Sequence, residues 1–486
     1  MSLVSASPLA PEPVPPITSW RQDRVFKIIL VVAVLLALAY NAAVLVGFGP
    51  DEPRHMAYVK LLLDKHQLPV IESTNPYRET DGAHAFHPPL YYVMLLPFYA
   101  LLRGLPGESA WHIVRLISGL LCLVALPLTY DVALRGADGD ARVARLAAGT
   151  LALLPIWGMT AGIINNDGAA LFFTALFLWL LTVRFAAGLN LRAALLLGLV
   201  LGLGGLCKAT VLLCGGVALL VAVAVRGKYR GQGAWLGTGV TLALGALLVS
   251  PWHLRSFRLY GTWTPLPQAA PWFNPPLHGL ELLAHPDFPR LFALCNWSLF
   301  DTLWSQRDWL LQHRTLPIGS FETPQLVIYL VLAALCLLAV AGHLKAVGKR
   351  PQIAKDVASK DVDSEEPTLS EEPPLSAAAT SAEPLSDTPQ ALAWAKSARW
   401  ASYAAFGMTW LTVLQVALSL HQGWAEGGRY LLPAMGGWCL FLARGWAKLF
   451  GARLAPFAHA WLGGLLLLNG IALYWLLAYL NPTYGS

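Results

Sequence analysis

The chain has 486 residues, of which 56% are hydrophobic and only 13% are charged, and its mean hydropathy is +0.53. A soluble domain carries about 25% charged residues, so this composition excludes an ordinary soluble enzyme. The formal net charge of +6 does not indicate a nucleic-acid-binding protein, because the Lys and Arg residues gather at the ends of apolar runs, as orientation in a membrane requires.

Apolar runs of roughly 18 to 25 residues recur along the chain, and each can cross a hydrocarbon core about 30 Å thick as a helix. The first run follows Arg21, Arg24 and Lys27 and is too long for a signal-peptide core, so we expect it to remain as a span. Backbone polar groups in lipid must be hydrogen-bonded within their own segment, which favours helices. The expected fold class is an all-α polytopic membrane helix bundle of about eleven spans, near 26–48, 110–134, 143–164, 168–187, 191–206, 209–225, 234–251, 325–344, 397–419, 430–447 and 457–479.

The positive-inside rule assigns an orientation, because Lys and Arg fall in every second loop. A cytoplasmic tail at 1–24 places the two largest loops, 49–109 and 252–324, on the outer face. This holds only if residues 88–102 do not cross the membrane. That segment is short, aromatic and interrupted by Pro97, so we expect a juxtamembrane helix in the first outer loop.

Residues 351–395 are rich in Pro, Ser, Ala and Glu, and nine acids lie between Asp356 and Asp387. Such a segment cannot bury enough apolar surface to offset its ordering entropy. We therefore expect a disordered acidic cytoplasmic linker at 346–396 between a transmembrane module at 25–345 and a C-terminal one at 397–486. The linker is either a plain tether or a regulatory or docking segment.

The six cysteines are scattered without a CxxC pair, which argues against a disulfide framework and a cysteine metal site. The residues that could take part in catalysis lie on the expected outer face. The first outer loop opens with adjacent carboxylates, Asp51 and Glu52, directly after the first span. A carboxylate near apolar surroundings can act as a base with a tuned proton affinity. The alternative is a solvated helix cap, since Asp-Glu-Pro is also a natural helix start.

Other polar residues fall on the same expected side. His87 precedes a Pro-Pro-Leu-Tyr-Tyr segment, and Asn165, Asn166 and Asp167 interrupt two apolar spans. Cations at this membrane boundary either extend toward water or together form a pocket for a lipid-linked phosphate. These cations are Arg115, Lys208, Arg255, Arg258 and Arg429.

Collectively these motifs resemble the GT-C superfamily of integral-membrane glycosyltransferases, in the branch that contains protein O-mannosyltransferases and the lipid A aminoarabinose transferase. The resemblance is carried by Asp51-Glu52-Pro53-x-His55-x-x-Tyr58 with Leu68-Pro69, His87-Pro88-Pro89-Leu90-Tyr91-Tyr92, Arg115-Leu116, Asn165-Asn166-Asp167, Pro251-Trp252-x-x-Arg255 with Tyr260-Gly261, and Arg429-Tyr430-Leu431-Leu432-Pro433. The family's Lys-Pro-Pro-Leu has His87 in place of lysine here.

This resemblance implies that module 25–345 is catalytic and moves a sugar from a polyprenyl-phosphate donor to a hydroxyl acceptor on a protein, lipid or glycan at the outer face. Asp51 would be the base, with Glu52 and Asp167 supporting it, and one base with direct displacement implies inversion. The donor phosphate would be held by His87, Arg115, Lys208, Arg255 and Arg429. Substrate contacts would come from His55, Tyr58, Tyr91, Asn166 and Tyr430.

We expect no cofactor, although a divalent cation on the carboxylates stays an alternative. The tryptophans of the second outer loop, Trp252, Trp263, Trp272, Trp297, Trp304 and Trp309, either stack on sugars or anchor the interface. The expected location is a bacterial plasma membrane. A transporter or lipid flippase is the main competing function, but it would place ionisable residues mid-span; a non-catalytic scaffold would tolerate neutralisation of Asp51.

Overall fold

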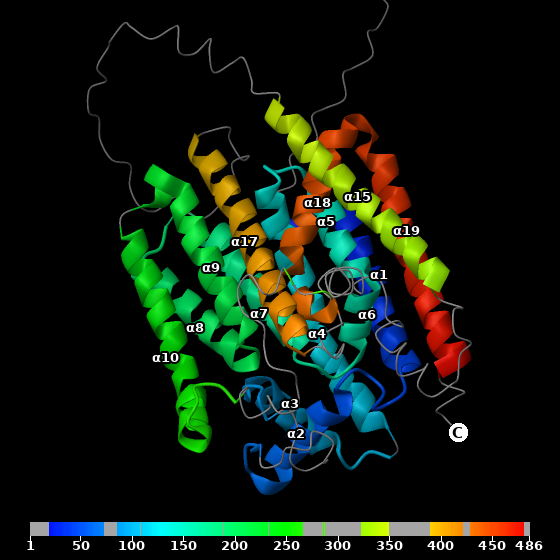
Figure 1. Ribbon diagram of the computed structural model, residues 1–486, viewed down its shortest axis with the longest axis vertical. Coiled ribbons are helices and arrows are strands. Elements are labelled where there is room, and N and C mark those ends of the chain that lie inside the picture. Colours follow the sequence, from blue (N-terminus) through cyan, green and yellow to red (C-terminus); the bar gives the residue numbers. More distant parts are fainter. Residues whose placement is uncertain are drawn as a thin grey trace, which may run out of the picture.

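The computed structural model describes residues 19–71, 85–106, 108–186, 188–231, 233–265, 284, 286, 322–348, 389–420 and 428–480. Within these residues every regular element is a helix, which confirms the all-α class (Figure 1). The long helices stand side by side, and the short helices α2 and α3 lie together at one end of the bundle (Figure 1). The chain is a multi-pass membrane protein.

The α-helices up to the second outer loop are α1 (Arg24–Ala43), α2 (Glu52–Lys65), α3 (Leu90–Leu102), α4 (Ser109–Gly136), α5 (Ala141–Leu153), α6 (Pro155–Gly162), α7 (Asp167–Trp179), α8 (Leu191–Cys207), α9 (Thr210–Arg226) and α10 (Ala234–Tyr260). Those that follow are α15 (Glu322–Gly348), α17 (Pro389–Leu420), α18 (Met435–Phe450) and α19 (Leu454–Trp475). Short 3-10 or π turns are η1 (Trp20–Gln22), η2 (Leu180–Arg184), η3 (Gly227–Arg230), η7 (Gly428–Ala434), η8 (Gly451–Arg453) and η9 (Leu476–Leu480).

Each expected span coincides with helix, but the count of eleven is not confirmed. Within the part of the chain that the structure describes, six helical stretches are long and apolar enough to cross a membrane, or seven if α5 and α6, which meet at a bend of 57°, form one span. Helix α3 is a shorter apolar helix beside α2, in agreement with the expected juxtamembrane helix. Pro155 begins α6 and has no N–H to continue the ladder of α5, which explains the bend.

The boundaries of the expected linker need correction. Helix α15 continues to Gly348 and α17 already begins at Pro389, so residues 346–348 and 389–396 are helical. Apolar residues at Leu392 and Trp394 extend the pattern of the following span and explain the earlier start. The centre of the linker lies outside the described residues, as do Trp272, Trp297, Trp304 and Trp309.

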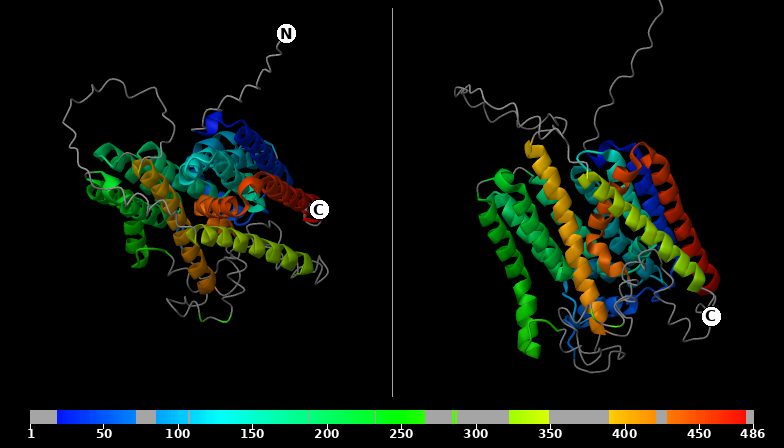
Figure 2. Two further views of the ribbon diagram at one scale, coloured as in Figure 1. Left: turned by 90° about the horizontal axis from the view of Figure 1, so that it is seen from above. Right: turned by 45° about the horizontal axis from the view of Figure 1, so that its top comes forward.

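Close backbone contacts hold the helices together. A Cβ at Gly119 of α4 would lie 2.2 Å from the carbonyl oxygen of Ala161 in α6, and one at Gly342 of α15 would lie 1.9 Å from that of Gly445 in α18. Small residues at helix contacts are typical of membrane bundles, where packing replaces the hydrophobic drive of water. In the view from above, α8, α9 and α10 form one side of the bundle and α1 and α19 the other (Figure 2).

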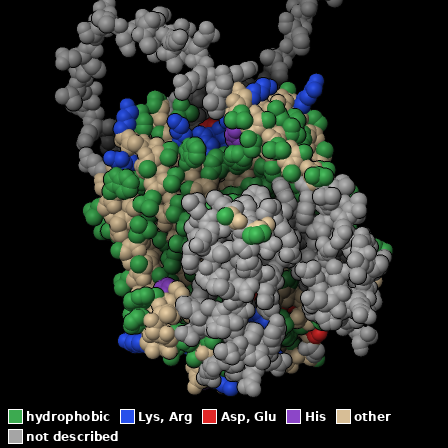
Figure 3. Space-filling model, viewed as in Figure 1, with side chains coloured by type: hydrophobic (Ala, Val, Ile, Leu, Met, Phe, Trp, Pro, Cys, Tyr) green, Lys and Arg blue, Asp and Glu red, His purple; other side chains and the backbone are tan. Residues whose placement is uncertain are grey.

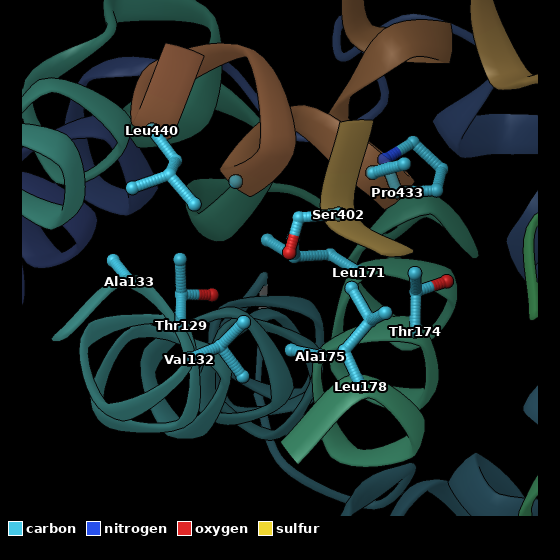
Figure 4. A pocket seen from close by; sticks show the side chains of 12 residues that line it. Thr129, Val132, Ala133, Leu171, Thr174, Ala175, Leu178, Ser402, Pro433 and Leu440 are labelled. Atoms are coloured by element: carbon cyan, nitrogen blue, oxygen red, sulfur yellow. The ribbon is translucent and has the colours of Figure 1, made fainter. Parts of the chain in front are cut away.

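Charged side chains mark the two ends of the bundle. Lys and Arg gather at the end away from α2 and α3, at the top of Figure 3. A small pocket lies between α4, α7, α17, η7 and the start of α18 (Figure 4). Its lining holds no charged side chain, so it is not a candidate reaction centre: it is formed by Thr129, Val132, Ala133, Leu171, Thr174, Ala175, Leu178, Ser402, Pro433, Ala434, Gly436 and Leu440.

Candidate functional site

Asp51 lies between the end of α1 and the start of α2. It occupies the N-cap position of α2 with a left-handed φ of 61°, and its side chain makes no capping hydrogen bond. Non-glycine residues rarely adopt this conformation, and where they do it is often at functional sites. The carboxylate instead accepts a hydrogen bond from Nη2 of Arg429 and lies 3.7 Å from Nη1 of Arg54, with 26% of the side chain exposed. Asp51 therefore stands at the cap position of α2 while its carboxylate pairs with Arg429.

Glu52 forms a buried ion pair with Arg115 of α4. Arg115 Nε donates to Glu52 Oε1 over 2.7 Å and Nη2 donates to Oε2 over 2.6 Å, and both side chains are fully buried. The carboxylate also accepts the backbone N–H of Gly47 and of Ile164. Glu52 thus joins α4, the end of α1 and the turn before α7.

The rest of the Arg115 guanidinium is also fully used. It donates to the backbone carbonyls of Asn41, Val44 and Leu45, at 2.7 to 3.0 Å. These bonds satisfy carbonyls at the C-terminal end of α1 that have no partner within the helix. All five N–H groups of an arginine are then occupied. In this structure Arg115 therefore holds Glu52 and α1 and offers no N–H to a phosphate.

Asp167 is the first residue of α7 and pairs with Lys208, which lies between α8 and α9. Lys208 Nζ donates to Asp167 Oδ1, and the two side chains are 8% and 3% exposed. Asn165 shapes the turn, because its Oδ1 accepts the N–H of Asp167 over 2.8 Å. Asn166 donates from Nδ2 to the carbonyl of Cys207 and so brings the two segments together. The expected acid and cation are in direct contact.

Tyr430 connects the two acid–cation pairs. Its ring lies 5.0 Å from Lys208 Nζ and 4.9 Å from Arg429 Cζ, both within the range of cation–π contact. Arg429 Nη2 also donates to the Tyr430 hydroxyl over 3.0 Å, and Nη1 donates to the carbonyl of Pro50. Asp51, Arg429, Tyr430, Lys208 and Asp167 thus form one continuous polar chain, which we call the paired-acid network.

An aromatic layer joins α2 and α3 beside this network. The rings of Tyr58 and Tyr92 stack 3.8 Å apart, and the Tyr92 hydroxyl lies 3.0 Å from His55 Nδ1. His87 lies 6.1 Å from His55, centroid to centroid, and its carbonyl accepts the Tyr58 hydroxyl. Tyr91 reaches α4, where its hydroxyl is 2.9 Å from Ser118 Oγ.

The tyrosines of this layer keep their protons to high pH. Burial raises the pKa of Tyr58, Tyr91 and Tyr92 above the ordinary value. For Tyr92 the charges of Asp51 and Asp167 act in the same direction, after burial and the neighbouring tyrosines. An anionic phenolate is disfavoured near carboxylates in an apolar environment. These phenols are therefore hydrogen-bond donors rather than bases.

Arg255 of α10 lies at the outer rim of the aromatic layer. Its Nη2 donates to the carbonyls of Leu68 and Pro69, over 3.2 and 2.9 Å, and its guanidinium stands over the ring of Trp252 at 5.4 Å. Its positive charge favours a lower pKa of Tyr58, but the larger effect of burial raises that pKa. No described contact joins Arg255 to the paired-acid network, so the structure separates it from Arg429 and Lys208.

Three contributors were absent from the residues predicted for the site. Tyr92 stood in the quoted Pro-Pro-Leu-Tyr-Tyr motif, and Arg54 occupied an unspecified position of the acidic motif. Asn165 stood next to Asn166 and Asp167, where an Asn before a helix is a common local cap. Within the described residues, no group of three His, Cys, Asp or Glu side chains could hold a metal ion.

Residues 86–254 match the family model described as dolichyl-phosphate-mannose-protein mannosyltransferase. This confirms the predicted resemblance to the GT-C superfamily over that segment, which holds Arg115, Asp167 and Lys208. No curated protein matches the chain.

Solved structures also match along most of the chain. The Archaeoglobus fulgidus oligosaccharyltransferase in the apo form matches with a TM-score of 0.48 and 13% identity, over 94% of this chain and 56% of that one. ArnT from Cupriavidus metallidurans matches in the apo state with a TM-score of 0.37 and 15% identity, over 88% and 77%, and its complex with undecaprenyl phosphate with 0.36 and 15%, over 88% and 78%. The chain spans about half the length of the oligosaccharyltransferase.

Proposed function

We propose that this chain is a membrane glycosyltransferase that moves a sugar from a polyprenyl-phosphate donor to a hydroxyl acceptor. The paired-acid network is the observation that carries the proposal. It brings two carboxylates and two cations from four distant segments to one end of a helix bundle. A carboxylate is suited to take a hydroxyl proton, and the cations are suited to a departing phosphate.

Asp51 is the base in this proposal. It is the less buried of the two adjacent acids, whereas Glu52 is fixed by Arg115 and has no exposed surface. The acceptor oxygen attacks the anomeric carbon while its proton passes to Asp51. The bond between that carbon and the phosphate oxygen breaks, and the polyprenyl phosphate leaves with the electron pair. A single displacement inverts the anomeric configuration.

Lys208 and Arg429 hold the donor phosphate in this proposal. Both cations are already paired, Arg429 with Asp51 and Lys208 with Asp167, so a phosphate must compete with these carboxylates. When the phosphate takes the Arg429 N–H groups, Asp51 is released to receive a proton. The donor is then required before the acceptor can be activated, which suppresses wasteful attack by water.

The other predicted residues take supporting roles. Glu52 and Arg115 fix the start of α2, and Asn166 fixes the Asp167 turn to the segment of Lys208. His55 and Tyr58 hold α2 to α3 through Tyr92, and Tyr91 holds α3 to α4. His87 borders the layer where an acceptor would approach. Arg255 anchors residues 68–69 of the first outer loop to α10.

The proposed location is a bacterial plasma membrane with the network on the outer face. The cations at the opposite end of the bundle support this orientation by the positive-inside rule (Figure 3). The acceptor is a protein, lipid or glycan hydroxyl, and the sugar is a hexose or pentose.

The decisive experiment compares the whole protein with Asp51→Asn in nanodiscs, using a panel of polyprenyl-phosphate sugars and membrane extract. Donor consumption is measured by mass spectrometry, and donor binding is measured separately. The Asn variant should bind the donor yet transfer at least about a hundredfold more slowly, since general base catalysis contributes about 10² to 10⁴.

Asp64→Asn is the matched control, because Asp64 lies on the same helix with a side chain that is 60% exposed. It should transfer at the wild-type rate. Equal rates for Asp51→Asn and wild type would overturn the assignment of the base. Movement of intact donor across a liposome membrane without sugar transfer would instead support the transporter.

A further inference from the structure

A second charged cluster lies at the end of the bundle opposite the paired-acid network. It is built where α18 packs against both α15 and α17, near the turn that joins α4 to α5. We call it the basic cluster, and its members are Asp138, His343, Arg399, Tyr403, Arg444 and Lys448.

Positive charge exceeds negative charge in the basic cluster. Asp138 is the carboxylate there, and it accepts Nη1 of Arg444 over 2.8 Å and Nη1 of Arg399 over 3.1 Å. The same two Nη1 groups donate to the carbonyl of Gly136. Arg399 and Arg444 repel each other, and Lys448 is repelled by both. Among the described residues of the cluster, one acid faces three cations, so two positive charges remain uncompensated.

Two polar atoms of the cluster are buried without a hydrogen-bond partner among the described residues. They are Nε of Arg444 and the hydroxyl oxygen of Tyr403. A buried donor without an acceptor costs about 1 to 3 kcal/mol, and more when it is charged. An anionic ligand with several oxygens would satisfy these groups.

The aromatic rings of the cluster fix its shape. Phe441 of α18 stacks on His343 at 4.4 Å and meets the edge of Tyr403 at 5.5 Å, so one ring supports both neighbouring helices. His343 Nε2 lies 2.9 Å from the Phe441 carbonyl and donates to it, which leaves Nδ1 as an acceptor facing Lys448 Nζ at 3.5 Å. The imidazole thereby directs the ammonium group into the cluster.

Apolar surface adjoins the cluster on both outer helices. Leu344, next to His343, is 66% exposed, and Trp400, next to Arg399, is 49% exposed. In a membrane protein such side chains face acyl chains, and a tryptophan beside cations is typical of the headgroup level. The ligand chemistry is therefore anionic at one end and apolar at the other.

We propose that the basic cluster binds the phosphate of an anionic phospholipid headgroup from the leaflet at that end, with the acyl chains along Leu344 and Trp400. Guanidinium groups match the oxygens of a phosphate in geometry, and basic pockets between transmembrane helices are suited to such headgroups. This proposal is independent of the transferase reaction.

The test measures lipid affinity of the full chain in a neutral detergent by native mass spectrometry. Phosphatidylglycerol and phosphatidylcholine with identical acyl chains are titrated. The wild type should bind phosphatidylglycerol at least tenfold more tightly. Lys448→Gln should weaken that binding about fivefold, the contribution of one cation near a membrane surface, and Arg444→Gln should weaken it further.

Arg192→Gln is the matched control, since Arg192 is exposed at the start of α8 and removes the same charge. It should leave the preference unchanged. Lys448 is exposed, so its variant keeps the test valid if Arg444→Gln fails to fold. Equal affinity for both lipids, or an equal loss in Arg192→Gln, would refute the site. The site would also be refuted if inorganic phosphate bound as tightly as phosphatidylglycerol. It would likewise be refuted if lipid binding were seen only after the acids of 356–387 are replaced by serine.

Discussion

Arg429 donates to the carboxylate of Asp51 and to the hydroxyl of Tyr430 from one guanidinium, although 378 residues separate it from Asp51. The segment between α1 and α2 and the segment before α18 therefore meet at the proposed base. This contact predicts that the C-terminal module is part of the reaction centre.

The first prediction concerns donor affinity. Arg429→Gln should weaken donor binding by about 10 to 100-fold, because a hydrogen bond to a charged group contributes about 1.5 to 3 kcal/mol. Asp51→Asn should bind the donor at least as tightly as wild type, because it releases Arg429 from a competing carboxylate. Fluorescence or calorimetric titration with a non-hydrolysable polyprenyl-phosphate sugar measures both. Weaker binding by Asp51→Asn would contradict the competition between phosphate and carboxylate.

The second prediction separates the ring of Tyr430 from its hydroxyl. Tyr430→Phe keeps both cation–π contacts and loses one hydrogen bond, so donor affinity should fall less than about tenfold. Tyr430→Leu removes the ring and should lower donor affinity further, since Lys208 and Arg429 both lose their cation–π contact with it. The same titration compares the two variants, and equal losses would show that the ring has no positioning role.

The third prediction concerns the Glu52–Arg115 pair. Breaking a buried ion pair leaves an uncompensated charge and costs about 3 to 5 kcal/mol. Arg115→Gln should therefore lower the unfolding temperature in detergent strongly. Arg103→Gln is the matched control, because Arg103 pairs with Asp64 at the surface with side chains that are 56% and 60% exposed. Such a pair contributes about 0 to 1 kcal/mol. If Arg115→Gln unfolds like wild type but loses donor affinity, Arg115 is a phosphate ligand after all.

The sequence predicted the helical class and the short helix α3. These depend on local periodicity and charge, which act over one or two helical turns. The sequence also shows that Asp51 and Glu52 are adjacent, but it does not predict that their surroundings differ. That difference depends on the left-handed backbone at Asp51 and on Arg115, which lies 63 residues after Glu52.

The cations illustrate the same limit. Arg115, Lys208, Arg255 and Arg429 all stand at a membrane boundary in the sequence, so they could not be told apart. Only the fold reveals their different partners. Arg115 donates its N–H groups to Glu52 and to carbonyls at the end of α1, and Arg255 donates to carbonyls of the first outer loop. Lys208 and Arg429 both contact the ring of Tyr430. Hydrogen-bond partners far apart in the chain leave no local pattern.

The last prediction concerns acid stability at the opposite end of the bundle. Asp23 is buried at the start of α1 and accepts hydrogen bonds from Arg145 Nε at 2.6 Å, from the Tyr130 hydroxyl and from the N–H of Phe26. Burial alone would raise the pKa of Asp23, but the bonds from Arg145, Tyr130 and Phe26 outweigh it and lower the pKa below the ordinary 3.8.

A lowered folded pKa gives stability that is present above the unfolded pKa and is lost as the pH falls through the folded value. Asp23→Asn should therefore lower the unfolding free energy at pH 6 by about 1.5 to 3 kcal/mol, the contribution of charged hydrogen bonds. The difference from wild type should shrink as the pH falls below 3.8, the ordinary pKa. Unfolding followed by circular dichroism in detergent measures this, with Asp64→Asn as the exposed control. A difference that stays constant with pH would mean that Asp23 acts by packing and not by charge.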